Sequence, residues 1–456
     1  MSKLISINPA KNQEVVGEVN VSTDAEIKEK VRLTDKAKLD WKELGTKKRI
    51  ELLKPVYEEF KKRKDEISSL ITKEMGKPVS ESIDEVEEAL TNFEWLLDNG
   101  EEVLADEVTH EDGKSRHMII YEPYGTTAVI TPWNFPFIIF IDGVISNLIA
   151  GNTVVFKISE ECPLIGKKIE GVMKSKNLPE GVFSEVYGDG KVGQKLAESD
   201  VDLIWFTGST KVGNLLYRIA ANKFIKVILE LGGSSPAIVF EDADISDSVS
   251  DIYSSRFLNC GQVCDVTKRL IVHESMFDKI IEKLKEEVAK KIIGDPSDKR
   301  TQIGPLVAKR QLELLENQVK DAVEKGAKII TGGKRPKRLN GVFYEPTILT
   351  NITKDTRVWK EEVFGPVLPI VIFKTEEEAI ELANDTPYGL GSKVYSRNIE
   401  RARRVASRIE AGSVEINGAN RWLMCNPFGG YKQSGMGRTR GIIGLRELCQ
   451  VKVISE

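Results

Sequence analysis

The sequence of 456 residues is poor in the residues that build disulfide scaffolds and metal sites, with five cysteines and three histidines. So few cysteines in so long a chain do not make a disulfide framework, which favours a reduced, cytoplasmic setting. None of the histidines stands at ligand spacing from a cysteine, so we expect no zinc site and no other bound metal.

The sequence also lacks a long uninterrupted apolar run. The longest apolar stretch, 136–156, contains Asp142, Asn147 and Asn152. These polar residues argue against a membrane-spanning helix and favour a buried helix followed by a strand. Residues 1–11 lack the basic-then-apolar pattern of a secretion signal, so we expect no membrane association.

No charge of one sign dominates, because 66 basic residues stand against 70 acidic ones, a net charge of −4. This balance argues against nucleic acid and against an anionic membrane surface as partners. The 41% of hydrophobic residues, with 36 glycines and 17 prolines, is an ordinary globular composition.

The order of predicted elements indicates an α/β fold with two lobes. At about 150 residues per domain, the length predicts roughly three domains or lobes. Residues 24–108 have mostly helical periodicity, and strand–helix alternation begins near residue 125, which is typical of parallel sheets covered by helices. We expect strands at 127–131, 152–156, 182–187, 236–240, 269–272, 367–372 and 414–417.

Other segments complete this prediction. Helices are expected at 275–289 and 310–325, and the change from one lobe to the other near Gly232. Two stray strands, 117–121 and 451–454, are expected to pair with each other or with a neighbouring subunit.

Two glycine-rich loops each follow a predicted strand and precede a helix. They are GDGKVG at 188–193 and GSTKVG at 208–213. Glycine lets the backbone approach a phosphate, and the helix N-terminus offers free N–H groups. In the second loop, Gly208 and Ser209 are the candidate phosphate contacts. A tight turn without a ligand is the alternative for each loop.

Lys157 and Glu160 follow the strand expected at 152–156. An ammonium and a carboxylate just past a strand end suit ribose hydroxyls, and a carboxylate repels a 2′-phosphate. The pair therefore favours NAD over NADP, although a solvated loop pair is the plain alternative.

Three residues suggest a nucleophilic site. Cys264 lies in a glycine-interrupted segment before a strand, and a cysteine is the best side-chain nucleophile near neutral pH. Glu230 ends a predicted strand beside two glycines, where it could act as a base. Asn134, between two prolines, could aim an amide donor at a developing oxyanion. The alternatives are a buried cysteine, a surface glutamate and a plain turn asparagine.

Six motifs in order along the chain make the sequence resemble the aldehyde dehydrogenase superfamily. The motifs are TPWNFPF at 131–137, FTGSTKVG at 206–213, ELGG at 230–233, GQVC at 261–264, EVFGP at 362–366 and PFGG at 427–430. The length and the ending YKQSGMGR at 431–438 are most similar to the compact succinate-semialdehyde and lactaldehyde dehydrogenases of microbes.

The resemblance implies a role for each motif. Cys264 would attack the aldehyde to give a thiohemiacetal, Asn134 and the N–H of Cys264 would hold the oxyanion, and Glu230 would activate the water that hydrolyses the thioester. Members that transfer the acyl group to coenzyme A typically lack this glutamate. The cofactor, NAD or NADP, would be held by Trp133, Lys157, Glu160, Gly208, Ser209, Glu362 and Phe364.

The resemblance also implies the domain plan. Residues 1–108 and 126–232 would form the NAD(P)-binding domain and 233–432 the catalytic domain. Residues 109–125 and 433–456 would form an oligomerisation hairpin and its partner strand. Members of the family are homodimers or homotetramers.

The substrate pocket departs from the pattern for succinate semialdehyde. Where such members often carry arginines, this chain has Asp142 and Leu258. An acidic group repels a substrate carboxylate, and leucine offers no donor. Arg421 could replace the missing arginines, or it could be a surface residue. Phe137, Leu258 and Trp422 suggest apolar walls, so small neutral or hydroxylated aldehydes such as lactaldehyde or glyceraldehyde are as plausible as semialdehydes.

Two further departures concern other parts of the site. Ile158 stands where the ribose loop usually has proline, which weakens the preference for NAD. Val266 replaces a second cysteine that forms a regulatory disulfide in some relatives, and Cys260 is expected to be structural. The alternatives to a hydrolysing aldehyde dehydrogenase are a cofactor-independent cysteine esterase, a non-phosphorylating glyceraldehyde-3-phosphate dehydrogenase, a non-catalytic protein, and a redox sensor built on Cys260 and Cys264.

Overall fold

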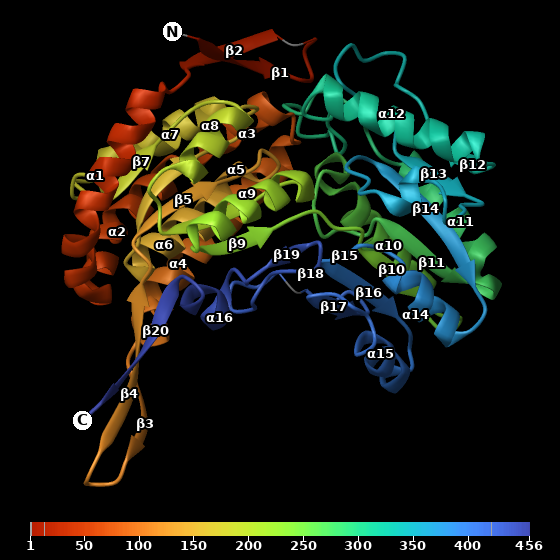
Figure 1. Cartoon of the computed structure of the whole chain (residues 1–456). Helices are drawn as coiled ribbons and strands as arrows, with labels where there is room; N and C mark the ends of the chain where they lie inside the picture. The colour runs from red at the N-terminus through yellow and green to blue at the C-terminus, as the bar shows by residue number, and fades with distance from the viewer. Residues whose placement is uncertain (1, 13, 421) are drawn as a thin grey trace.

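The computed structural model describes residues 2–12, 14–420 and 422–456 and has the α/β architecture that the sequence predicts (Figure 1). The first large sheet has six strands in the order β19-β9-β8-β5-β6-β7. The strands from β5 to β9 run parallel, and β19 is antiparallel at the edge beside β9. Their bounds are β5 (Thr126–Ile130), β6 (Thr153–Lys157), β7 (Phe183–Glu185), β8 (Leu203–Thr207), β9 (Lys226–Glu230) and β19 (Gly435–Met436).

Helices cover this sheet. Thr23 begins the first of them with a capping box, in which its hydroxyl accepts from the Glu26 N–H at 3.2 Å while the Glu26 carboxylate accepts from the Thr23 N–H. Around the sheet lie α1 (Asp24–Glu43), α2 (Gly45–Lys62), α3 (Lys64–Met75), α4 (Val79–Val103), α7 (Pro163–Lys174), α8 (Gly190–Glu198) and α9 (Thr210–Lys223). The strands β1 (Lys3–Asn8) and β2 (Glu14–Asn20) form a separate antiparallel pair.

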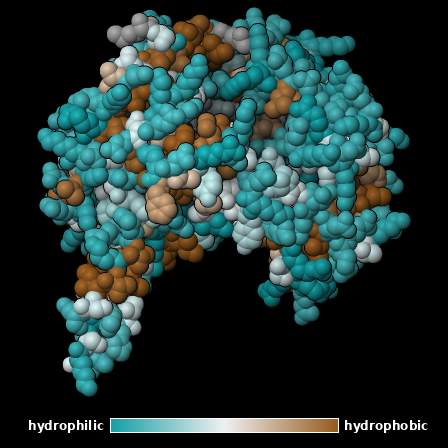
Figure 2. All heavy atoms as spheres, in the orientation of Figure 1, coloured by the Kyte–Doolittle hydropathy of each residue, from teal (hydrophilic) through white to brown (hydrophobic). Residues whose placement is uncertain are grey.

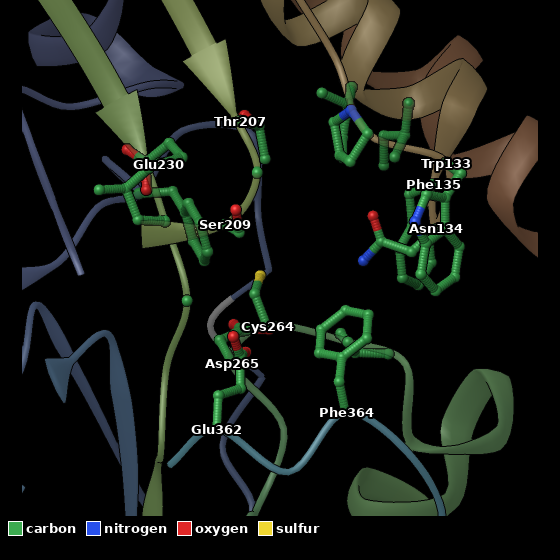
Figure 3. Close-up of a pocket in the computed structure, with 18 of the residues that line it drawn as sticks. Trp133, Asn134, Phe135, Thr207, Ser209, Glu230, Cys264, Asp265, Glu362 and Phe364 are labelled. Atoms are coloured by element: carbon green, nitrogen blue, oxygen red, sulfur yellow. The ribbon is translucent and has the colours of Figure 1, made fainter. Parts of the chain in front are cut away.

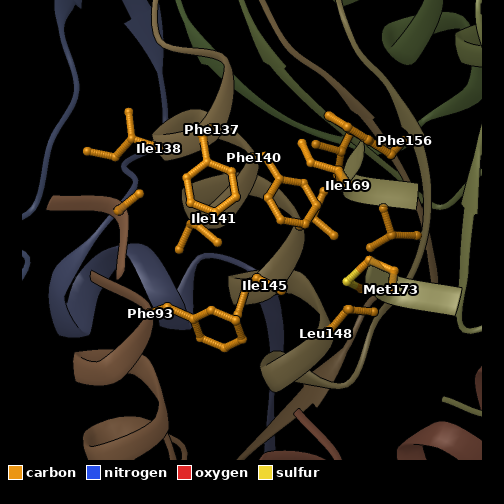
Figure 4. Close-up of a cluster of buried hydrophobic side chains, with 14 of the residues drawn as sticks. Phe93, Phe137, Ile138, Phe140, Ile141, Ile145, Leu148, Phe156, Ile169 and Met173 are labelled. Carbon is orange, nitrogen blue, oxygen red and sulfur yellow. The ribbon is translucent and has the colours of Figure 1, made fainter. Parts of the chain in front are cut away.

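The apolar stretch 136–156 is the predicted buried helix followed by a strand. It comprises α5 (Pro136–Phe140), a π-helical turn η1 (Ile141–Ile145), α6 (Ser146–Ala150) and then β6. Its side chains pack with those of α4 and α7 in the largest apolar core of the described residues, as Figure 4 shows. Burial of this surface is the main term that holds the first domain together.

The second large sheet has seven strands in the order β12-β13-β14-β11-β10-β16-β17. All neighbours are parallel except β12 and β13. The strands are β10 (Pro236–Val239), β11 (Arg269–His273), β12 (Lys328–Thr331), β13 (Thr347–Thr350), β14 (Val367–Phe373), β16 (Gly391–Tyr395) and β17 (Ser413–Ile416). The longer helices of this domain are α10 (Ile245–Phe257), α11 (Phe277–Ala289), α12 (Lys309–Glu324), α14 (Glu376–Asn384) and α15 (Ile399–Ala406).

A hairpin projects from the body (Figure 1). Strands β3 (Glu107–Glu111) and β4 (Arg116–Pro123) form it, and β20 (Cys449–Ser455) completes a three-stranded antiparallel sheet in the order β20-β4-β3. Val451 lies opposite Tyr121 and Ile454 opposite Met118, so the two stray strands pair with each other, which is one of the two expected alternatives. Figure 2 shows hydrophobic atoms gathered where the hairpin leaves the body.

Each predicted strand overlaps an observed one, but of the strands given above, β1, β2, β3, β12, β13, β16 and β19 were not predicted. The segment 433–456 also divides: β20 belongs to the hairpin sheet, whereas β19 pairs Gly435 with Glu230 at the edge of the first sheet. The smaller elements are η2 (Leu258–Gly261), η3 (Glu274–Met276), α13 (Arg357–Lys360), β15 (Tyr388–Gly389), β18 (Tyr431–Lys432) and α16 (Gly441–Arg446). No helix within the described ranges is long and apolar enough to cross a membrane.

Candidate active site

A cavity of about 860 Å³ lies between the two domains, at the carboxyl ends of β8 and β9. Cys264, Glu230 and Asn134 all line it, although 34 or more residues separate any two of them in the sequence. Figure 3 shows the Cys264 sulfur projecting into the space between Glu230 and Asn134. In parallel α/β sheets ligands bind outside the carboxyl ends of the strands, which is where this cavity lies.

The loop that carries Cys264 has a constrained backbone. Asn259 and Cys260 have φ of 49° and 55°, a left-handed conformation that is rare for residues other than glycine. Gly261 follows with φ of 73°, and a Cβ there would lie 2.4 Å from the carbonyl oxygen of Gly365. Strain of this kind persists where the surrounding structure fixes it, and here it precedes the half-buried thiol of Cys264.

The electrostatic setting of the thiol disfavours the thiolate form. Burial raises the pKa of Cys264, the neighbouring carboxylate of Asp265 raises it further, and the cation of Lys268 opposes both. The thiol therefore needs a base, or a change in its surroundings, to react as thiolate.

Asn134 is held by a network of amides. Its Nδ2 donates to the carbonyl oxygen of Gln262 at 3.0 Å, and Nδ2 of Asn259 donates to the carbonyl oxygen of Asn134 at 3.0 Å. The Gln262 side chain in turn accepts from the N–H of Val307 at 2.9 Å. An amide nitrogen carries two hydrogens, so one remains for a group bound beside Cys264.

Glu230 ends β9, with 4% of its surface exposed. Among the described residues, neither of its carboxylate oxygens has a hydrogen-bond partner. Burial raises the pKa of Glu230 well above its usual range, and the guanidinium of Arg438 opposes this. A buried carboxyl whose pKa is raised is suited to exchange protons.

The second glycine loop lines the cavity. The N–H of Gly208 donates to the carbonyl oxygen of Glu230 at 3.0 Å, and the Ser209 hydroxyl accepts from the N–H of Val212 at the start of α9. A Cβ on Gly208 would lie 2.3 Å from the ring of Phe206, so the close approach of this ring favours glycine here. The first loop, 188–193, is instead a capped turn outside the cavity wall, in which Asp189 accepts from the N–H of Lys191.

Lys157 and Glu160 are paired at the end of β6. Nζ of Lys157 lies 3.7 Å from the Glu160 carboxylate and donates to the carbonyl oxygen of Ile158 at 3.1 Å. Burial lowers the pKa of Lys157, and Glu160 opposes this. Both residues lie outside the wall of the Cys264 cavity, on the same carboxyl edge of the sheet.

Glu362, Phe364 and Trp133 also line the cavity. The rings of Trp133 and Phe364 meet edge to face with centroids 5.6 Å apart. The Glu362 carboxylate accepts from the N–H of Gly233 at 3.1 Å and pairs with the buried ammonium of Lys268.

The predicted substrate-pocket residues separate into three groups. Asp142, Leu258 and Trp422 line the cavity. Phe137 does not: it is fully buried in the core against Phe60, with ring centroids 5.1 Å apart, because its position on α5 turns it away from the cavity (Figure 4). Arg421 lies outside the described residues.

Sequence reasoning missed three charged residues of the site. Arg440 lines the cavity from the segment expected to serve oligomerisation, Asp265 follows the nucleophile directly, and Lys268 is buried behind Glu362. The spacing of Lys268, four residues after Cys264, was a visible signal, whereas nothing local marks Arg440. In the part of the chain that the structure describes, no group of histidine, cysteine or acidic residues could hold a metal ion.

Comparisons with known proteins show what the whole chain is similar to. The model of the aldehyde dehydrogenase family matches residues 2–454. A glutarate-semialdehyde dehydrogenase of Pseudomonas aeruginosa is 36% identical over 455 residues, which is 99% of this chain and 93% of the relative. The crystal structure of an NADP-dependent enzyme of Escherichia coli has a TM-score of 0.96 at 34% identity and covers 100% of this chain and 95% of its own. A betaine aldehyde dehydrogenase of Staphylococcus aureus, in complex with NAD⁺, has a TM-score of 0.96 at 33% identity over 100% and 94% of the two chains.

Proposed function

Because the chain belongs to the aldehyde dehydrogenase family of oxidoreductases, we propose that it oxidises a small aldehyde to the carboxylic acid through a covalent intermediate on Cys264. The observation that carries this proposal is the placement of a half-buried thiol between an amide donor, Asn134, and a buried carboxyl, Glu230, in one cavity. A nucleophile, a hydrogen-bond donor and a base are the three groups that acyl chemistry at a carbonyl carbon needs.

Cys264, Asn134 and Glu230 each have a separate role in the proposed reaction. Cys264 releases its proton to solvent, and its sulfur forms a C–S bond with the aldehyde carbon while the C=O π bond opens to the oxyanion of a thiohemiacetal. Nδ2 of Asn134 and the N–H of Cys264 stabilise the oxyanion, and removing one such donor costs about 3 kcal/mol of barrier. Glu230 then takes a proton from the water that cleaves the thioester, so the acid leaves and the thiol is regenerated.

The cavity suits a nicotinamide coenzyme. Gly208 and Ser209 stand at the N-terminus of α9, which favours pyrophosphate, and Glu362 offers a carboxylate to ribose hydroxyls beside Trp133 and Phe364. The chemistry that the coenzyme supplies when bound is acceptance of a hydride, which converts the thiohemiacetal to the thioester. Lys157 and Glu160 would hold the second ribose. Since Glu160 disfavours a 2′-phosphate, we favour NAD over NADP.

The exposed hairpin sheet and the free thiol bear on the oligomeric state of the protein and on its cellular compartment. Val451 and Val453 of β20 are 63% and 60% exposed on the projecting sheet, an apolar surface suited to a second copy of the chain in a homodimer or homotetramer. Chemistry at a free thiol fits a reduced compartment, so we place the protein in the cytoplasm.

The test is initial-rate reduction of NAD and of NADP over a panel of aldehydes, with wild-type protein and Cys264→Ala. We expect cofactor reduction with at least one aldehyde and a loss of at least about a thousandfold in Cys264→Ala. Cys425→Ser, at an exposed cysteine, is the matched control and should leave the rate unchanged. Turnover of esters without any aldehyde-dependent cofactor reduction would instead support the cysteine esterase, and activity retained in Cys264→Ala would overturn the proposal.

A further inference from the structure

Arg440 is a cation inside the cavity whose guanidinium is already occupied. Its Nε and Nη2 each donate to Oδ2 of Asp142 at 2.8 Å, and Nη1 lies 3.7 Å from the carboxylate of Glu88. Oδ1 of Asp142 accepts from Nδ2 of Asn92 at 3.3 Å. The side chains of Arg440 and Asp142 are 11% and 8% exposed, so the pair is largely removed from solvent.

The backbone fixes both partners. Asp142 lies on η1, in the buried core element between α5 and α6. Arg440 has φ of 61° and follows Thr439, which exchanges two backbone hydrogen bonds with Phe428 at 2.7 and 2.8 Å. The next residue, Gly441, donates its N–H to the carbonyl oxygen of Met424 at 2.8 Å. The backbone hydrogen bonds around both residues therefore fix the Asp142–Arg440 ion pair as part of the cavity wall.

The charge around this pair is negative. Glu88, Asp142 and Asp265 all line the cavity, and all three carboxylates are close enough to interact electrostatically with the Arg440 guanidinium. Asp265 accepts from Nε1 of Trp422 at 2.8 Å. The other lysine or arginine among the described lining residues is Lys211, on α9 beside the glycine loop. An incoming carboxylate or phosphate would therefore meet excess negative charge and, among the described lining residues, no arginine without a carboxylate partner, whereas hydrogen-bond donors would meet acceptors.

We propose that Asp142 is a specificity-determining residue: by occupying Arg440 it excludes aldehydes that carry a carboxylate or phosphate and admits those whose far end bears a hydrogen-bond donor, hydroxyl or ammonium. The inference rests on the proposed aldehyde oxidation and names its substrate class. It assigns Asp142 an active part in selection, because this side chain adds negative charge and also occupies Arg440, the one arginine among the described lining residues.

The experiment compares kcat/KM for five aldehydes: butanal, glyceraldehyde, 3-aminopropanal, succinate semialdehyde and glyceraldehyde 3-phosphate. For the wild-type protein we expect glyceraldehyde or 3-aminopropanal to exceed both anionic aldehydes by at least about tenfold, and the preferred one of the two identifies the donor group. In Asp142→Asn, which keeps the shape but removes the charge, the ratio for succinate semialdehyde over butanal should rise about tenfold.

Two further variants separate specificity from structural support. Adding Arg440→Gln to Asp142→Asn should cancel the gain for succinate semialdehyde, since the gain depends on the released guanidinium. Asp242→Asn, which removes a carboxylate paired with Arg401 outside the cavity wall, is the matched control and should leave the ratio unchanged. Wild-type preference for an anionic aldehyde, or an unchanged ratio in Asp142→Asn, would overturn the inference. Absence of cofactor reduction with every aldehyde would instead overturn the proposed function, so the two failures are distinguishable.

Discussion

The buried ammonium of Lys268 forms an ion pair with the carboxylate of Glu362 behind the wall of the candidate active site. The Lys268 side chain is 0% exposed and that of Glu362 20% exposed, and Nζ of Lys268 also lies 5.0 Å from the centroid of the Phe364 ring. Lys268 follows Cys264 by four positions. It therefore links the loop of the nucleophile to Glu362, the residue proposed to hold the nicotinamide ribose.

Replacing Lys268 with methionine should therefore affect two properties at once. Glu362 loses its partner, so KM for the cofactor should rise about tenfold. The thiol loses a nearby positive charge that lowers the pKa of Cys264, so alkylation by iodoacetamide at a fixed pH should slow by about tenfold. Lys393→Met is the control, because Lys393 is likewise buried and paired with Asp251 and Glu415 but lies outside the cavity wall. Equal effects in both variants would contradict the assigned role.

The pH dependence of thioester hydrolysis should report Glu230. Burial raises the pKa of this carboxyl, so the group is protonated at low pH and becomes a base only as pH rises through that raised value. We expect the hydrolysis rate to rise with pH in the wild-type protein. Glu230→Gln should hydrolyse the thioester at least about a hundredfold more slowly and without this rise. Single-turnover measurement of acyl-enzyme decay from pH 6 to 9 tests this, and a pH-dependent rise that survives in the variant would refute the role.

Gly233 should be needed for the position of the nucleophile. A Cβ at this residue would lie 2.5 Å from the carbonyl oxygen of Cys264, closer than real Cβ contacts allow. Gly233→Ala should displace the Cys264 loop and lower kcat by about a hundredfold, because a shift of about 1 Å in a reacting group has an effect of this size. Gly171→Ala, at a site with nothing within 4 Å of the new Cβ, serves as control. Equal activity in the two variants would contradict the prediction.

The pair of Lys77 and Glu85 should stabilise the turn that carries Asn134. Both side chains are 0% exposed and form an ion pair, and Oε1 of Glu85 accepts from the N–H of Phe137 at 2.9 Å. Glu85→Ala leaves a buried ammonium unpaired and should lower the free energy of unfolding by about 3–5 kcal/mol. Urea unfolding followed by tryptophan fluorescence measures this. The neighbouring exposed Asp84→Ala should change it by less than about 0.5 kcal/mol, and a similarly small change in Glu85→Ala would refute the prediction.

The sequence was sufficient for the fold class and for the family because both depend on local signals. Strand–helix alternation predicts parallel sheets, and the motifs around Asn134, Glu230 and Cys264 are continuous stretches whose residue types limit their chemistry. The pairing of residues 117–121 with 451–454 could also be predicted, since both are short β-rich runs that lie outside the expected sheets.

Only the tertiary structure decided which side chains share the cavity. Phe137 is next to a motif that lines the site, yet the helical turn of α5 directs it into the core. Arg440 and Asp142 are 298 positions apart and were brought together by packing of the chain end on η1. The same holds for the amide network of Asn134 and for the ion pair of Lys268. Sequence patterns encode which face of a helix or strand is buried. Charge pairing between residues far apart in the sequence depends instead on how those elements are placed in three dimensions. The choice of substrate depends on the same placement, because it decides which charges line the cavity.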